Sequence, residues 1–187
     1  MADELVAMMA DDQYLLQRLF EAGELPSASY HPRMKALHER NAARLKAIIG
    51  RHGWPGRSLV GEEAAKAAWL IAQHAVSDLP FMTECIGHLE AAVARGEAPG
   101  WQLAFLQDRV RTLSSEPQVY GTQFDVDDGG WPTPFPVEAP ETVNARRAAL
   151  GMNFLEERLA QMIERERRRR APRDQAPQAS SDPDEKR

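Results

Sequence analysis

Residues 64–76 have the sequence AAKAAWLIAQHAV. Apolar side chains cover almost every side of the helix that this stretch predicts, and only Lys66, Gln73 and His74 interrupt them. A helix that is hydrophobic all round is buried by its neighbours, and its alanines let those neighbours pack closely. We therefore expect a helix that begins at Ser58 or Gly61, ends near Val76, and lies at the centre of a helical bundle.

Apolar spacing predicts further helices on both sides of this one. The expected helices span residues 2–21, 32–49, the stretch from a cap at Ser77-Asp78 to Gly96, residues 100–113 and residues 141–170. Residues 118–124 have β-type character, Asp127-Asp128-Gly129-Gly130 is a turn sequence, and the proline-rich residues 131–137 fit an edge strand or an irregular loop.

Together these patterns predict a mainly α protein with a single domain. The domain spans residues 1–170 and is a bundle of five to six helices with a short β-like hairpin or loop. Residues 171–187 are rich in Pro, Gln, Ser and mixed charge. Such a composition cannot bury enough apolar surface to fold, so we expect a disordered tail.

Composition and charge limit the classes of partner. The chain has 187 residues, 43% of them hydrophobic and 27% charged, which is typical of one globular domain. Its net charge of -5 divides into -7 for residues 1–163 and +2 for residues 164–187. An acidic body repels a phosphate backbone, so we expect no nucleic-acid partner. The arginine run at residues 167–170 fits a solvated helix end instead.

The compartment is predicted from simple absences. The longest apolar run, residues 67–72, is too short to cross a bilayer, and the acidic start Met1-Ala2-Asp3-Glu4 does not resemble a signal peptide. The single cysteine, Cys85, cannot form an internal disulfide. We expect a cytoplasmic protein with no membrane partner; the sequence leaves its oligomeric state open.

Polar residues on apolar helix faces are the candidates for a functional site. His38 and Asn41 lie one turn apart, in the middle of the apolar face of the helix over residues 32–49. Gln73 and His74 interrupt the central helix. A buried polar group without a partner costs roughly 1–3 kcal/mol, so each of these side chains needs either a structural partner or a ligand.

Three other places add candidates. The segment Gln118–Gln123 concentrates donors, acceptors and a phenol around a glycine, as ligand-binding loops do. Arg109 borders the inner seam of its helix, whereas Asp108 points away from that seam and is expected at the surface or behind the site. Asn144 lies on the inner side of the last helix, and Arg147 lies at the edge of that side.

Familiar catalytic signatures are absent from the sequence. It contains no phosphate-binding loop, no nucleophile elbow and no zinc spacing. Glu84 and His88 lie on one helix face, but a lone pair is weak evidence for a metal. Cys85 lies among apolar residues and fits a packed thiol. Because the two inward histidines lack an evident third ligand, we expect no metal and no cofactor.

Several short motifs resemble a bacterial family of domains of unknown function. The resemblance spans about Leu37 to Leu155, although Val76 stands where the family often has Asp, with Asp78 as a possible substitute. It implies which residues matter but no activity. The motifs are Gly53-Trp54-Pro55, Ser58-Leu59-Val60-Gly61, Gln73-His74-Ala75, Asp108-Arg109-Val110, Gln118-Val119-Tyr120-Gly121-Thr122-Gln123, and Asn144-x-Arg146-Arg147 followed by Gly151.

Two functional hypotheses follow. In the first, the protein binds, and can act on, a small polar or anionic ligand, with His74, His38 and Tyr120 as catalytic residues. The residues expected to bind this ligand are Asn41, Gln73, Arg109, Gln118, Gln123, Asn144 and Arg147. In the second, the protein is a non-catalytic interaction module whose inward polar residues form a structural hydrogen-bond network. A pocket open to solvent favours the first hypothesis, and a sealed network favours the second.

Overall fold

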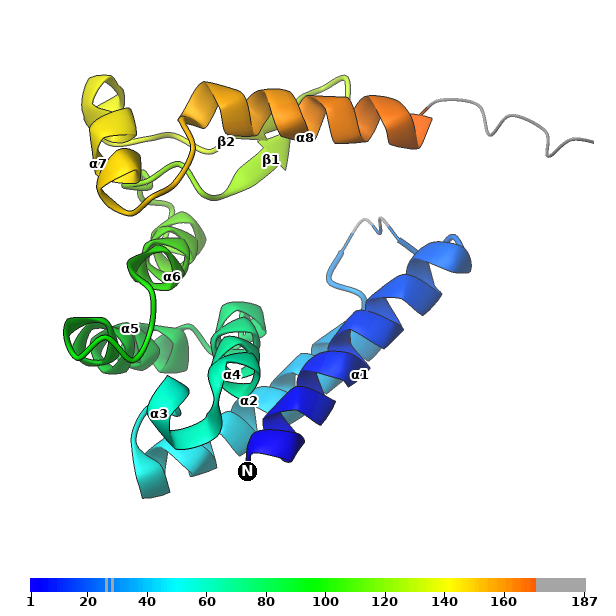
Figure 1. The fold of residues 1–187 in the computed structure, drawn as a ribbon. Helices are drawn as coiled ribbons and strands as arrows, with labels where there is room; N and C mark the ends of the chain where they lie inside the picture. Colours follow the sequence, from blue (N-terminus) through cyan, green and yellow to red (C-terminus); the bar gives the residue numbers. More distant parts are fainter. Residues whose placement is uncertain (26, 28, 171–187) are drawn as a thin grey trace, which may run out of the picture.

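A computed structural model describes residues 1–25, 27 and 29–170 (Figure 1). The described part of the chain is mainly α-helical, which confirms the predicted fold class; the tail expected at 171–187 lies outside it. None of its helices is long and apolar enough to cross a membrane. The elements are α1 (Ala2–Glu21), α2 (Pro32–His52), α3 (Arg57–Val60), α4 (Glu62–His74), α5 (Leu79–Ala94), α6 (Gly100–Leu113), β1 (Phe124–Val126), β2 (Pro132–Pro134), the 3-10 helix η1 (Pro140–Thr142), α7 (Val143–Ala149) and α8 (Leu155–Arg170).

Helix α4 is the centre of the bundle, as its sequence predicts. It packs against α1, α2, α3, α5 and α6. Of the two starts expected for the central helix, Gly61 is confirmed and Ser58 is wrong: Gly61 has a φ of +82° and separates the short α3 from α4. Only glycine adopts such a conformation without strain, so the chain turns there between the two helices.

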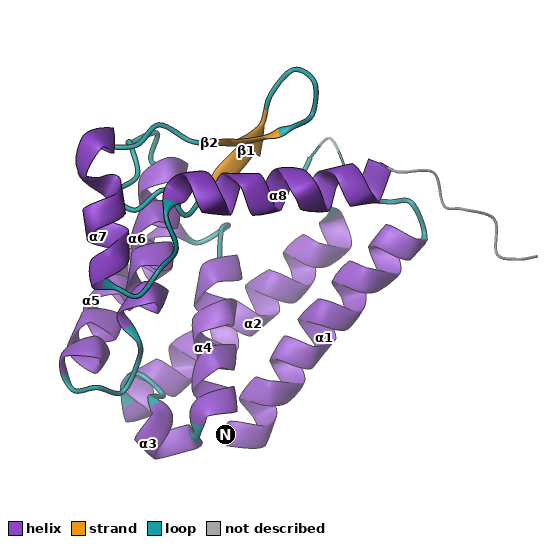
Figure 2. Ribbon diagram, turned by 45° about the horizontal axis from the view of Figure 1, so that its top comes forward, coloured by secondary structure: helices purple, strands orange, loops and turns teal. Residues whose placement is uncertain are grey.

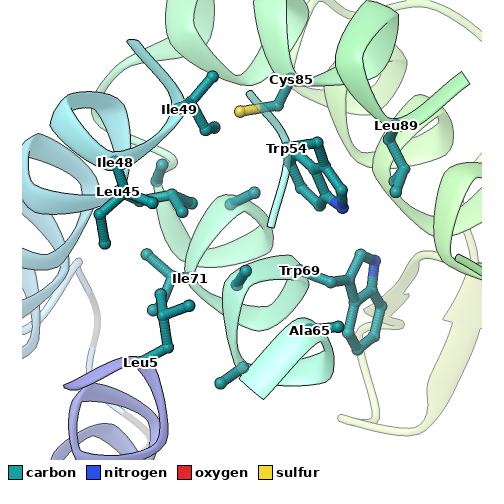
Figure 3. Packing of buried hydrophobic residues seen from close by; sticks show 14 of the residues in the cluster. Leu5, Leu45, Ile48, Ile49, Trp54, Ala65, Trp69, Ile71, Cys85 and Leu89 are labelled. Carbon is teal, nitrogen blue, oxygen red and sulfur yellow. The ribbon is translucent and has the colours of Figure 1, made fainter. Parts of the chain in front are cut away.

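The hydrophobic core is formed by buried side chains of α4 and of the elements that pack around it, among them α2 and α5 (Figure 3). Ile71 of α4 faces Leu45 and Ile48 of α2, whereas Trp69 points to the opposite side of α4, where Trp54 of the α2–α3 loop and Leu89 of α5 lie. Ala67, Ala68 and Ala72 are fully buried. These small side chains explain how several helices approach α4 at once.

The prediction of one continuous helix over residues 141–170 is wrong. The chain forms η1, α7 and α8, and the break falls at Gly151, whose φ is +66°. Asn144 Oδ1 accepts a hydrogen bond of 2.9 Å from Leu155 N, the first residue of α8. A left-handed glycine that ends one helix and a side-chain cap that begins the next explain the interruption.

The β-like excursion is a two-stranded antiparallel hairpin. Phe124 pairs with Pro134 and Val126 with Pro132, around the predicted turn at residues 127–130. The strand is shorter than expected, because residues 118–123 form a loop instead. Figure 2 shows α8 lying beside this hairpin, on the far side of the molecule from α3.

We expect the close packing around α4 to be sensitive to volume. Replacing Ala68 by Leu adds side-chain atoms where Ala68 is fully buried, and overpacking of this kind costs about 1–3 kcal/mol of unfolding free energy. Urea denaturation measures the loss. Lys66→Leu is the control, because it introduces the same side chain at an exposed position of α4. Equal stability of the two variants would contradict a tightly packed α4.

Candidate functional site

His38 and His74 meet at a buried carboxylate that joins three helices. Asp12 of α1 is 2% exposed. Its Oδ2 lies 2.8 Å from His38 Nε2 of α2 and 2.7 Å from His74 Nδ1 of α4. The two imidazole rings are 4.7 Å apart between centroids. We call these three residues the Asp12 cluster.

The α1–α2 connection adds a phenol to this cluster. Tyr30 Oη forms a hydrogen bond with His38 Nδ1. Burial, with a smaller contribution from Asp12, raises the pKa of Tyr30 to about 12, so the phenol keeps its proton at neutral pH. Since Tyr30 occupies Nδ1 of His38, Nε2 is the ring nitrogen that lies beside Asp12.

Asp12 is the residue of the cluster that the sequence analysis missed, although a signal for it exists. Leu5, Met8, Asp12 and Leu19 are the buried residues of α1. Asp12 therefore lies four residues after Met8, within the apolar stripe. The same reasoning that selected His38 on α2 would have selected Asp12 on α1. Nothing in the sequence indicates that the loop residue Tyr30 contacts His38.

The carboxyl group of Asp12 is held in its ionised form. Burial alone would raise its pKa, but the interactions with the nearby imidazoles of His38 and His74 outweigh burial and lower the pKa well below the usual range. Among the described residues no lysine or arginine pairs with this carboxylate. The two imidazoles are therefore its only partners of potential positive charge.

A pocket of about 300 Å³ lies against the cluster. Its lining includes His38, His74, Lys46 and Asp78. The side chain of His74 is 22% exposed, whereas that of His38 is 9% exposed. His74 Nε2 has no hydrogen-bond partner among the described residues and is not buried. This nitrogen is therefore available to a molecule in the pocket.

Asn41 and Gln73 lie next to the cluster and have different surroundings. Asn41 Nδ2 donates to the backbone oxygen of Met8 at 3.4 Å, which ties α2 to α1. Gln73 is 3% exposed, yet its side-chain amide nitrogen and oxygen lack a hydrogen-bond partner within the described residues. A buried amide without hydrogen-bond partners destabilises the folded state, so Gln73 marks a place where the protein tolerates that loss of stability.

Arg109 joins the Asp12 cluster region to the second group of predicted residues. Its Nη1 donates to the backbone oxygen of Gln73 at 3.2 Å, and its Nε donates to Gln123 Oε1 at 2.9 Å. Burial lowers the pKa of this guanidinium. No carboxylate forms an ion pair with Arg109 in the part of the chain that the structure describes.

Asp108 organises the second group, and the expectation that it lies at the surface is wrong. Asp108 is fully buried. Its carboxylate accepts hydrogen bonds from the backbone N–H groups of Val119, Tyr120 and Thr122 and from the hydroxyl of Thr122, at 2.7–3.1 Å. The loop over residues 118–123 folds onto this side of α6, which is why the residue pointing away from the helical core is nevertheless buried.

Gln118 and Gln123 complete the same loop. Gln118 Nε2 donates to the backbone oxygens of Gln123 and Phe135, and Gln118 Oε1 accepts from Gln123 N. The backbone N–H of Tyr120 is bound by Asp108, and its carbonyl accepts from Arg147. The phenol that contacts His38 is that of Tyr30 rather than the expected Tyr120.

Arg147 and Asn144 are also engaged with the protein itself. Arg147 is 1% exposed. Its guanidinium donates to the backbone oxygens of Tyr120, Gly121 and Asn153 and to Asn153 Oδ1. Asn144 caps α8 and donates to Glu156. These contacts leave few donors for a ligand, so the network around Asp108 is a closed structural one.

The sequence offered two histidines but no third residue that could bind a metal ion, and the structure adds a third. Asp12, His38 and His74 each offer one ligand atom, and these atoms lie within 4.8 Å of one another. The third ligand that the sequence appeared to lack is therefore present.

Cys85 is fully buried and burial raises its pKa to about 12, which confirms the packed thiol. Glu84 and His88 are a surface pair 3.7 Å apart.

Comparisons with known proteins confirm the resemblance to a family of unknown function. The family of unknown function DUF6624 matches residues 1–166. The match includes the Asp12 cluster, the Asp108 network and the hairpin. No curated protein and no solved structure matches the chain.

The Asp108 network is expected to be essential for stability. In Asp108→Asn an amide N–H group faces a backbone N–H group, so at least one buried donor loses its acceptor, at about 1–3 kcal/mol. We expect urea denaturation to show a loss of roughly 1–3 kcal/mol. Asp125→Asn, on the exposed strand β1, is the control. An unchanged unfolding free energy in Asp108→Asn would refute the role of this carboxylate.

The Asp12 carboxylate predicts a stability change in acid. Its pKa in the folded protein lies below the ordinary value of 3.8, so its contribution is present above about pH 4 and is lost as the pH falls below that value. We expect the melting temperature of the wild type, followed by circular dichroism between pH 5 and pH 3, to fall more steeply than that of Asp12→Asn. Asp11→Asn, which removes the neighbouring exposed carboxylate, should keep the wild-type slope. Parallel slopes for Asp12→Asn and wild type would contradict the ion pairing.

Proposed function

Because the chain belongs to a family of unknown function, we propose its function from the geometry of the site. The protein binds a small polar ligand in the pocket beside His38 and His74, and His74 exchanges a proton with that ligand. One observation carries this proposal: His74 is held by the buried Asp12 through Nδ1 while its side chain is partly exposed in a pocket. An imidazole whose Nδ1–H donates to a carboxylate presents Nε2 as a base, which is the arrangement of general acid–base catalysis.

Access to solvent favours the pocket beside the Asp12 cluster over the Asp108 network. The side chains around Asp108 bond to the protein's own backbone and form a sealed network. A second pocket, of about 320 Å³, is lined by Arg147 and Arg158, but the donors of Arg147 are already bonded to carbonyls and to Asn153. By contrast, His74 Nε2 has no hydrogen-bond partner within the described residues, and His74 lines the first pocket.

The charged side chains that line the pocket are mixed, with Lys46 beside Glu39 and Asp78, so Lys46 is the place in it where an anionic group of a ligand would bind. Lys46 lines the pocket, and its ammonium is 3.9 Å from Asp78, an exposed and therefore weak pair. Arg109 lies behind His74, where it bonds to the carbonyl of Gln73. The anionic ligand that the sequence assigned to Arg109 and Arg147 would therefore depend on Lys46, with Arg109 adding its positive charge from a greater depth.

Nucleic acid is not the partner that we propose. The arginines at the end of α8 pair with acidic residues of the same helix: Arg168 with Glu164, and Arg169 and Arg170 with Glu166. Such pairs fit a solvated helix end. A cytoplasmic location remains part of the proposal, as the sequence predicts.

A thermal-shift screen tests ligand binding. A panel of small carboxylates, phosphates, amides and alcohols is added to the wild type and to His74→Gln. A ligand at 100 times its Kd stabilises the folded state by about 2.7 kcal/mol, which raises the melting temperature measurably. We expect at least one compound to shift the wild type and to lose its effect in His74→Gln.

The control is His88→Gln, which removes a surface histidine outside the pocket and should keep the full shift. A ligand that shifts His74→Gln as much as the wild type would refute the site. If no compound shifts the wild type, and His74→Gln and His38→Gln only lower the melting temperature, then the second hypothesis, a protein-interaction module with a structural network, replaces this one.

A further inference from the structure

We propose that Asp12, His38 and His74 bind one divalent transition-metal ion, with Zn²⁺ as the simplest occupant. The ion would be coordinated by a carboxylate oxygen of Asp12, His38 Nε2 and His74 Nδ1. This inference deepens the proposed function and rests on it for its chemical meaning, because it names the cofactor of the same site. It departs from the expectation that no metal binds.

The donor set is suited to such an ion. Two imidazole nitrogens and one carboxylate are the ligands of open zinc sites and of other sites that keep a position for substrate. Both nitrogens lie 2.7–2.8 Å from the same Asp12 oxygen. Zinc bonds of about 2.0–2.1 Å in a tetrahedron place ligand atoms roughly 3.3 Å apart. The two nitrogen–oxygen distances would have to lengthen by about half an ångström to accommodate the ion, and all three ligand atoms already lie within 4.8 Å of one another.

Hydrogen bonding alone does not satisfy the cluster. His38 Nε2 is buried and only 2.8 Å from Asp12 Oδ2, yet its direction does not align with that oxygen for a hydrogen bond, and no described residue provides another partner. A buried ring nitrogen that lies close to a carboxylate without forming a hydrogen bond to it is placed as it would be if both groups coordinated the same metal ion. A buried nitrogen left without a partner would otherwise destabilise the fold.

The charge of the cluster also favours a cation. Asp12 is a 2% exposed carboxylate whose only ion-pair partners in the described chain are the two histidines. A buried carboxylate without a compensating positive charge is strongly unfavourable. Neutral imidazoles supply hydrogen bonds but no charge, whereas a divalent ion between the three side chains supplies both charge and ligand bonds.

Tyr30 occupies the position of an outer-shell partner. Histidines that bind metal usually hydrogen-bond through their other ring nitrogen, which fixes the ring and the tautomer. Tyr30 Oη contacts His38 Nδ1 and leaves Nε2 for the metal. This contact comes from the α1–α2 connection, outside the three helices that supply the ligands, and so adds an independent support to the site.

Three protein ligands leave a coordination position for water or for the ligand in the pocket. His38 and His74 both line that pocket. With His74 Nδ1 bonded to the ion, the acid–base role assigned to His74 would pass to metal-bound water, because zinc lowers the pKa of its water to about 7. An anionic group of the ligand would bind the same position.

The test uses the full chain without an affinity tag, treated with a chelator and then dialysed. Zn²⁺, Co²⁺ and Mg²⁺ are titrated separately by calorimetry, and bound zinc is counted by elemental analysis. We expect one Zn²⁺ and one Co²⁺ per chain and no binding of Mg²⁺, which prefers oxygen ligands. Asp12→Asn and His74→Gln should weaken Zn²⁺ binding by at least about 100-fold, and Tyr30→Phe by about 10-fold, the lower end for an outer-shell partner.

The double variant Glu84→Gln, His88→Gln is the matched control, because it removes a surface carboxylate–histidine pair and should leave Zn²⁺ binding unchanged. His74→Gln changes a partly exposed side chain, so its folding can be verified by circular dichroism if Asp12→Asn is unstable. Failure of the wild type to bind Zn²⁺ or Co²⁺ stoichiometrically would overturn the inference. Binding that survives in His74→Gln but disappears in the surface double variant would also overturn it.

Repeating the ligand screen with chelated and with zinc-loaded protein separates the two proposals. A ligand shift in chelated protein that does not bind zinc supports the ligand pocket and overturns the metal site. Stoichiometric zinc binding without any ligand shift in either form supports the metal site and overturns the proposed ligand.

Discussion

The arrangement of the helices depends on the burial of α4, in which Lys66 is the one exposed residue between Ala64 and Gln73. Its alanines are buried, and α1, α2, α3, α5 and α6 all pack against it. A helix without a polar face can only be stable in this environment. Gln73 and His74 lie at its C-terminal end and are carried into the structure with it, beside α1 and α2. The site is therefore a consequence of the packing of α4.

Two buried carboxylates, Asp108 and Asp12, have different partners and different roles in this fold. Asp108 meets backbone N–H groups and a hydroxyl from one short loop, so its oxygens are saturated and the loop is fixed. Asp12 meets two imidazoles from separate helices. Imidazoles exchange protons and bind metals near neutral pH, whereas backbone amides do neither. The same residue type thus stabilises a loop at one place and prepares reactive nitrogens at the other.

Helical periodicity explains how far the sequence could predict this protein. It predicted α1 and α6 with their observed bounds, and it found His38 as a polar residue within an apolar face. The same rule applied to α1 leads to Asp12, which continues the apolar stripe of Leu5 and Met8. Asp108 was misplaced for another reason. A helical wheel shows which side faces the bundle, but it does not show that a loop covers the opposite side.

The sequence by itself determined the helical fold, the central position of α4 and the turn of the hairpin, because these depend on neighbouring residues along the chain and on local backbone preferences. Only the tertiary structure decided which polar residues meet. Asp12, His38 and His74 are separated by 26 and 36 residues in the chain, and Tyr30 reaches His38 from a loop. Such contacts depend on how three helices cross and on where a connection returns, and no local pattern specifies that geometry.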